Sequence, residues 1–130
     1  MVYFTVRLVV VEEMLDLNSF VVILYENKDG SGKHIEFQRA LSFDEQDIRS
    51  GMNTYCTVTG DGATHYGGVN GWGISDTTLA LQLETEAAVA LGMEQEFHVA
   101  LELNEASLSR LMSGLTRVFE MQPNQIEKLH

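Results

Sequence analysis

The chain has 130 residues, of which 45% are hydrophobic and 21% charged, and 19 Asp and Glu against 8 Lys and Arg give a net charge of −11. This length and hydrophobic content suit one ordinary domain with a core and argue against disorder. The negative charge disfavours binding to nucleic acid or to anionic membranes and favours a basic protein partner. The alternative is that the charge only keeps the protein in solution.

The first residues, MVYFTVRLVVVEE, do not have the pattern of a signal peptide. No basic region precedes the apolar run, Arg7 interrupts it, and Glu12 and Glu13 stand where a cleavage site is expected. No apolar run approaches the roughly 18 residues that cross a bilayer. The single cysteine, Cys56, has no partner for an internal disulfide. We therefore expect a cytoplasmic protein.

The first two thirds of the chain are predicted to be mainly strands. Alternation of Phe4, Val6, Leu8 and Val10 predicts the first strand, and the continuous apolar run 20–25 predicts a central strand covered on both faces. The turn-forming sequence NKDGSG follows it and predicts a hairpin. Further strands are expected at 34–38, 54–59, 64–74, 79–83 and 97–103, with an irregular segment at 40–53.

Two helices are expected among and after these strands. A short one runs through Leu91, with Thr85 as its cap and Gly92 as its stop. The second begins after Asn104 and has one apolar stripe, made of Leu108, Leu111, Met112, Leu115, Val118 and Phe119. The predicted fold is α+β, with a mostly antiparallel sheet of six to seven strands and a C-terminal amphipathic helix packed on one face. We expect one domain at 1–122 and a flexible tail at 123–130.

An acidic stretch lies in the irregular segment, where FDEQD places Asp44, Glu45 and Asp47 within five residues. On a loop, these carboxylates could contact Lys and Arg of a partner protein. They could also hold a hard cation, but the spacing lacks the glycine and the distal Glu of a calcium loop. The third alternative is a solvated turn.

A second candidate is the segment THYGGVNGW, in which glycines interrupt a predicted strand. Glycine within a strand marks a bulge or the close approach of another chain. The amphipathic side chains of His65, Tyr66 and Trp72 suit a binding surface. The alternative is that Tyr66 and Trp72 fill the core while the glycines shape the sheet. With Asp44, Glu45 and Asp47, these three residues form the predicted partner-binding set.

Catalysis and metal binding have weak support in the sequence. Cys56 with a histidine and Asp61 could be drawn as a nucleophilic site, but a strand interior rarely exposes a nucleophile. His34, His65 and His98 lie on separate predicted strands, and their spacing does not match a zinc site. We expect no enzyme activity, no metal and no cofactor.

The run from Phe37 to Trp72 resembles the immunity protein 10 family of bacterial polymorphic toxin systems. The likeness is carried by FQR at 37–39, FDEQD, GMNTYC at 51–56 and HYGGV at 65–69, and more loosely by VRLVVVEE and by the strand and helix after Trp72.

The resemblance implies a cognate toxin as partner, with a basic cleft of the kind found in nucleases or deaminases. It implies stoichiometric binding rather than turnover, and neither nucleic acid nor membrane is an expected partner. A homodimer stays open. The rival hypothesis is an acidic secretion chaperone, which would open with a helix instead of the strand predicted here.

Overall fold

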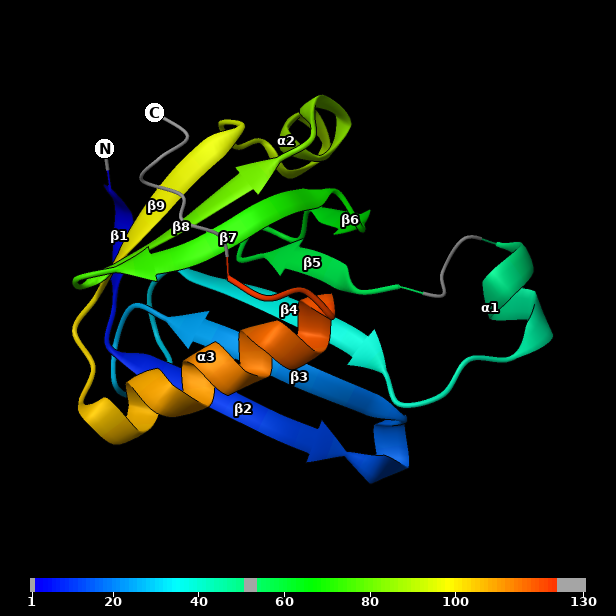
Figure 1. The fold of residues 1–130 in the computed structure, drawn as a ribbon, viewed down its shortest axis with the longest axis horizontal. Helices are drawn as coiled ribbons and strands as arrows, with labels where there is room; N and C mark the ends of the chain where they lie inside the picture. The colour runs from blue at the N-terminus through cyan, green and yellow to red at the C-terminus, as the bar shows by residue number, and fades with distance from the viewer. Residues whose placement is uncertain (1, 51–53, 124–130) are drawn as a thin grey trace.

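The computed structural model describes residues 2–50 and 54–123, and these contain nine strands in two sheets (Figure 1). Sheet A contains, in spatial order, β1 (Val2–Val6), β9 (Glu96–Leu101), β8 (Thr78–Leu83) and β7 (Val69–Ser75). Sheet B contains β2 (Leu8–Met14), β3 (Ser19–Tyr25), β4 (His34–Ala40), β5 (Cys56–Thr59) and β6 (Thr64–Tyr66). The helical segments are η1 (Leu15–Leu17), α1 (Glu45–Arg49), α2 (Thr85–Leu91) and α3 (Glu105–Phe119). The predicted α+β class is confirmed, with more strands than expected and a second sheet.

The first predicted strand is divided between the two sheets at Arg7. Phe4 and Val6 are buried in sheet A, whereas after Arg7 the alternation shifts and Val9 is the buried residue of β2. Arg7 lies between β1 and β2 and belongs to neither strand. Its backbone N–H donates to Tyr25 O at 3.0 Å, and its guanidinium donates to the carbonyl of Glu26. At Arg7, therefore, the buried positions of the strand change from even-numbered to odd-numbered residues.

The glycine-interrupted strand predicted at 64–74 is also two strands. β6 is an edge strand of sheet B and β7 is an edge strand of sheet A, and between them Gly67 and Gly68 have φ of 68° and 88°. A Cβ atom on Gly68 would lie 2.6 Å from the Cβ of Ala87 in α2. The expected close approach to a glycine is thus made by this chain's own helix, and the glycines let the chain turn from one sheet to the other.

Helix α3 packs on one face of sheet B, as predicted for the C-terminal helix (Figure 1). The close contact is at Gly114, where an added Cβ would lie 3.0 Å from methyl groups of Val11 and Val22. The helix also brings Phe119 against the rings of Phe37 and Tyr55, with centroids 5.0 and 4.9 Å away. The core therefore lies between α3 and the inner faces of both sheets.

The ends of the helices and the buried stripe of α3 follow the prediction, with one difference in each. The side chain of Asn104 accepts from Ser107 N at 2.8 Å, and Gly92 ends α2 with φ of 67°. Thr85, expected as a cap, is the first residue within α2. Met112 was expected on the buried stripe of α3 but is exposed, because Gly114 and Leu115 lie nearer the centre of the buried face.

The loops differ most from expectation in the segment predicted to be irregular. NKDGSG does connect β3 to β4, but 45–49 form the short helix α1. The motif residues 51–53 lie outside the described part of the chain. The same holds for 124–130, which form most of the predicted tail.

Candidate partner-binding surface

Sheet B has one face turned away from α3, which we call the outer face. Antiparallel pairing sets its composition, because residues paired across strands point to the same side. Since Phe20, Val22 and Leu24 belong to the core, the intervening residues of β3 point outward. The register then assigns to the outer face Leu8, Val10, Glu12 and Met14 of β2, Ser19, Val21, Ile23 and Tyr25 of β3, His34, Glu36, Gln38 and Ala40 of β4, Cys56 and Val58 of β5, and Thr64 and Tyr66 of β6.

The centre of this face is apolar and lies outside the core cluster. Val21, Ile23 and Cys56 are buried, yet they do not belong to the cluster of core residues between the sheets and α3. Ile23 lies between Val10 and Glu36 in the register, and the Gln38 amide donates to the Glu36 carboxylate along β4. The central strand is thus covered by α3 on one face and by neighbouring strand side chains on the other.

A groove opens at one end of the outer face, with a cavity of about 210 Å³. Its floor is formed by residues of the outer face, and its walls are formed by the end of η1 and by α1. The lining residues are Leu17, Asn18, Ser19, Gln38, Ala40, Asp47, Thr54, Cys56 and Tyr66. The groove therefore joins two connections of sheet B, β2–β3 and β4–β5, to its outer surface.

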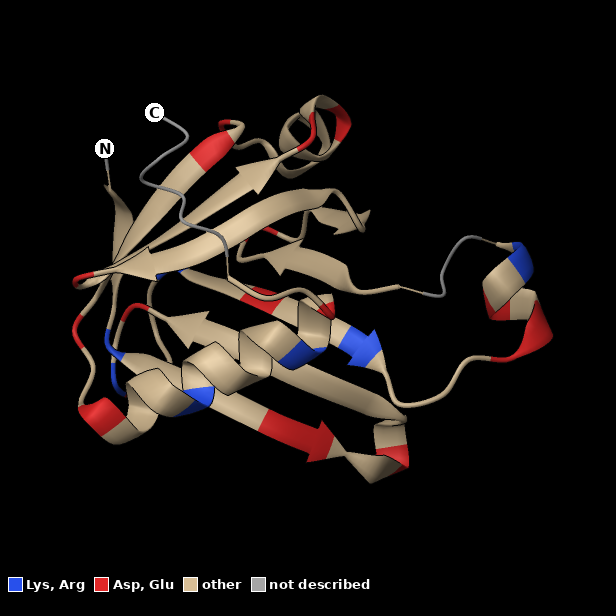
Figure 2. Cartoon of the chain, viewed as in Figure 1, with Lys and Arg blue, Asp and Glu red and all other residues tan. Residues whose placement is uncertain are grey.

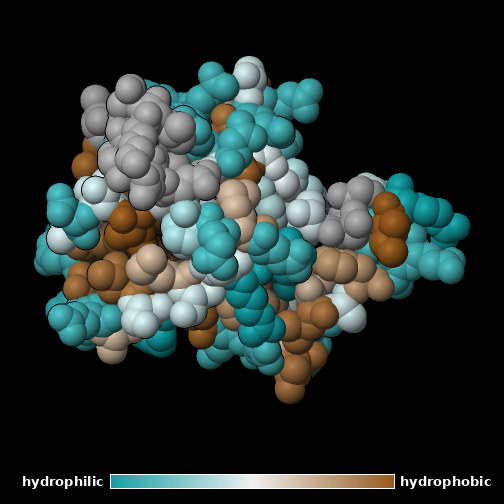
Figure 3. Space-filling model, in the orientation of Figure 1, coloured by the Kyte–Doolittle hydropathy of each residue, from teal (hydrophilic) through white to brown (hydrophobic). Residues whose placement is uncertain are grey.

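The elements beside the groove expose large apolar side chains. Leu15 and Leu17 of η1 are 78% and 67% exposed, and Ile48 of α1 and Tyr66 of β6 are exposed as well. In Figure 3, apolar atoms project at the places that η1 and α1 occupy in Figure 1. Exposed apolar side chains beside a groove are typical of a binding surface.

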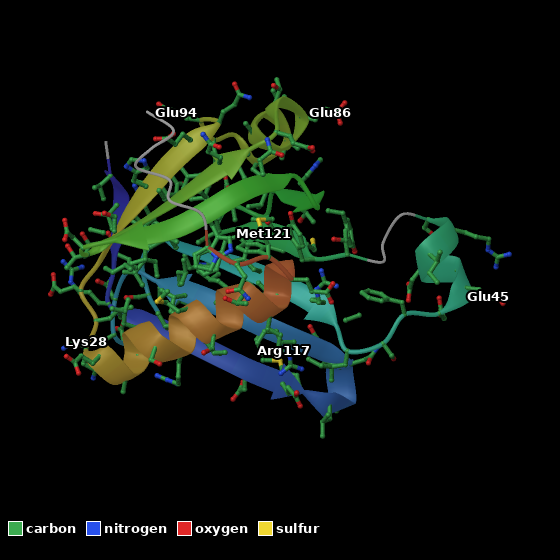
Figure 4. All side chains as sticks on the ribbon, viewed as in Figure 1. Lys28, Glu45, Glu86, Glu94, Arg117 and Met121 are labelled. Carbon is green, nitrogen blue, oxygen red and sulfur yellow. The ribbon has the colours of Figure 1, made fainter. Side chains whose placement is uncertain are left out.

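The acidic stretch forms the beginning of α1. The Asp44 carboxylate accepts from Asp47 N at 2.8 Å, and the Asp47 carboxylate accepts from Asp44 N at 3.1 Å, which is a capping box. Glu45 projects from α1 away from both sheets (Figure 4). Two of the three carboxylates therefore hold the helix end as well as carrying charge.

Two of the predicted binding residues line the groove. Asp47 and Tyr66 are far apart in sequence, yet both line the same cavity. Tyr66 is 43% exposed, and Asp44 and Glu45 are exposed on the same short helix as Asp47. Four of the six residues thus lie at one end of sheet B.

Trp72 and His65 lie elsewhere. Trp72 has 0% exposure, and its indole N–H donates to the carbonyl of Met121 at 3.0 Å, where the chain leaves α3 beneath β7 (Figure 4). The prediction of Trp72 as an exposed anchor is wrong, because its position in β7 faces the core. His65 is half-buried and pairs with buried Thr57, so it lies on the opposite face of β6 from Tyr66.

Cys56 is buried in the floor of the groove, and burial raises the pKa of its thiol. A raised pKa lowers the thiolate fraction that a nucleophile requires. The ring of His34 lies beside that of Tyr25, with centroids 5.7 Å apart and planes tilted by 43°, and His98 lies 2.9 Å from the carboxylate of Glu96. Within 2–50 and 54–123, no group of three or more His, Cys, Asp and Glu residues is arranged to hold a metal ion.

Acidic residues are distributed over the molecule, as Figure 2 shows. They lie on α1, at the end of β2, around α2 and at the start of α3. The basic residue of α1 is Arg49, whereas Arg39 is held inward, where its Nε donates to the carbonyl of Val118 at 2.7 Å. Negative charge is therefore general to the surface, and the groove end combines it with exposed apolar side chains.

No helix in the described part of the chain has the length and apolar character needed to cross a membrane.

Comparison with known proteins gives one match. No curated protein matches the chain in sequence, and no solved structure matches it. The sequence model of the family described as immunity protein 10 matches residues 5–109. These residues include both sheets except for the start of β1, and they include only the first turn of α3. This match covers well over half of the 130 residues. The family is one of immunity proteins for toxin systems, and the chain belongs to the immunity protein 10 family.

Proposed function

We propose that this protein binds a cognate bacterial toxin in the cytoplasm and neutralises it by stoichiometric occlusion, without turnover of a substrate. The observation that carries the proposal is the groove lined by both Asp47 and Tyr66, with exposed apolar side chains on the elements beside it. Family membership supplies the class of partner. The described surface supplies a place where such a partner can bind.

Charge supports a basic toxin, such as a nuclease or deaminase with a phosphate-binding cleft. A net charge of −11 attracts a basic protein from a distance and raises the rate of encounter. In this proposal Asp44, Glu45 and Asp47 act on association, because they are exposed or half-buried at the rim of the groove. Nucleic acid and membranes are not proposed as partners of this chain.

Affinity in this proposal comes from a few apolar contacts. A stable interface buries on the order of 1,600 Å² in total, and a minority of its residues carry most of the binding energy. Tyr66 is the aromatic residue at the rim and the candidate anchor. Removing its ring should therefore raise the dissociation rate more than it lowers the association rate.

The test uses a candidate toxin domain taken from a gene adjacent to the one for this chain, expressed with and without the chain. Protection of the cells and a one-to-one complex of the purified proteins are the expected results. The triple variant Asp44→Asn, Glu45→Gln and Asp47→Asn should associate more slowly, with a weaker dependence on salt, because three charges are removed while Asn still caps α1.

A matched control removes three charges from the region of α2. The variant Glu84→Gln, Glu86→Gln and Glu94→Gln changes exposed carboxylates that do not line the groove. It should alter association less than the α1 variant. Equal effects of the two triple variants would assign steering to net charge alone, and absence of a complex with the wild-type chain would reject the function.

A further inference from the structure

The outer face of sheet B continues beyond the groove as a surface of mixed apolar and polar side chains. The described helices do not lie over it: α3 packs on the inner face, α2 packs with the core through Ala87 and Ala88, and η1 and α1 flank one end. Val10 and Val58 are half-buried at outward positions on either side of Ile23. A partner element laid on this face would cover them.

The charges on this face have one sign. Among the outward positions of the five described strands, the charged residues are Glu12 and Glu36, and no Lys or Arg occurs. Asp47 adds a third carboxylate in the groove. A carboxylate beside an apolar surface favours a partner that brings a cation with its apolar side chains.

A second copy of this chain does not fit that requirement. Two such faces packed together would bring Glu12 and Glu36 of each copy toward carboxylates of the other, and like charges across an interface oppose binding. A small molecule fits less well, because the 210 Å³ cavity is below the roughly 300–1,000 Å³ usual for such sites. The groove is of a size to take part of a protein side chain.

We infer that the outer face of sheet B, from Val10 and Ile23 to the groove at Tyr66, binds a segment of the toxin in which apolar side chains are flanked by Lys or Arg. This inference rests on the proposed function and names the surface that performs it. The apolar side chains of the toxin segment lie on Val10 and Val58, which are half-buried, and its cations meet Glu12, Glu36 and Asp47. The rim residues of α1 then contribute to encounter, while the sheet contributes to the lifetime of the complex.

The test compares substitutions of exposed or half-exposed valines. Val58→Lys places a cation beside Glu36, its neighbour on β4, where it competes with the cation of the toxin, and its aliphatic stem can lie along the sheet without unfolding it. Val89→Lys is the matched control, because Val89 is 78% exposed on α2, away from the face. With the adjacent gene's toxin domain as the probe, Val58→Lys should weaken binding by about tenfold or more, and Val89→Lys should not.

Further measurements separate the possible outcomes. Circular dichroism melting of each variant reports whether it is folded. If the Val58→Lys variant is not folded, Val10→Lys and Tyr66→Ala test other sites on the same face. Glu36→Gln should reduce the salt dependence of binding if a cation of the toxin meets that carboxylate.

If the wild-type chain binds the toxin and the folded face variants bind equally well, the inference is overturned while the proposed function stands. If the wild-type chain does not bind, the proposed function fails first. If the chain alone sediments as a dimer that Val58→Lys dissociates, the face belongs to a second copy, and the inference is likewise overturned.

Discussion

Trp72 and Tyr66 are six positions apart and similar in chemistry, yet only one can contact another protein. Trp72 faces the core of sheet A and contacts Phe119, with ring centroids 6.2 Å apart. Tyr66 points outward from sheet B beside Cys56. Residue type suggested a binding role for both, but the pairing of β6 and β7 with different sheets decides which ring is accessible.

Replacing Trp72 by Phe should lower the free energy of unfolding by about 2–4 kcal/mol. The smaller ring leaves a cavity, and the carbonyl of Met121 loses its donor. Urea unfolding followed by circular dichroism measures this, because Trp72 is the sole tryptophan and its fluorescence is lost with it. Tyr66→Phe, at an exposed site, should stay within about 0.5 kcal/mol of wild type. Similar losses in both variants would contradict the assignment of Trp72 to the core.

At the level of elements, the link between β6 and β7 carries the division into two sheets. Gly67 and Gly68 both have positive φ, and α2 lies against Gly68. Glycine is required at this place for conformation and for space.

Gly68→Ala should therefore destabilise the protein more than Gly62→Ala. The two glycines have nearly the same φ, 88° and 90°, but a Cβ at Gly62 has no heavy atom within 4 Å, whereas one at Gly68 meets Ala87. The cost of positive φ, about 1–2 kcal/mol, is common to both, and crowding adds about 1–3 kcal/mol at Gly68. Urea unfolding of the two variants gives the difference, and equal losses would show that α2 moves aside freely.

The sequence was sufficient for most elements and for part of the surface. Alternation in β8 and β9 and the cap of α3 by Asn104 were read correctly, because each depends on near neighbours. Helix α1 was missed, although Asp44 and Asp47 have the three-residue spacing of a capping box and could have revealed it. The outer face was missed because its composition depends on the pairing of strands distant in sequence. The apolar run of β3 indicated that both faces of the strand are buried. It did not indicate that α3 buries one face and that side chains of neighbouring strands bury the other.

At the level of the whole molecule, the surface carries far more carboxylates than cations. They are spread over several elements, and few are close to a cation (Figure 2). Repulsion among them opposes the compact state, and salt screens it over a Debye length of about 10 Å at 0.1 M.

The melting temperature should therefore rise as sodium chloride increases from about 0.01 to about 0.2 M. The control variant with Glu84, Glu86 and Glu94 changed to Gln has a net charge of −11 + 3 = −8 and should show a smaller rise. A melting temperature that falls with salt would mean that ion pairs such as Arg117–Glu13, at 2.7 Å, outweigh the repulsion.

Strand β1 pairs in parallel with β9, so Val2 lies beside His98, 98 − 2 = 96 positions away. During synthesis, β1 leaves the ribosome long before its neighbour in the sheet has been made. Sheet B contains only residues 8–66 and can pair much earlier. Contacts between distant parts of a chain form slowly. Completion of sheet A should therefore be a late step in folding, and a nascent chain halted before β9 should have an unpaired first strand that a chaperone or protease can bind.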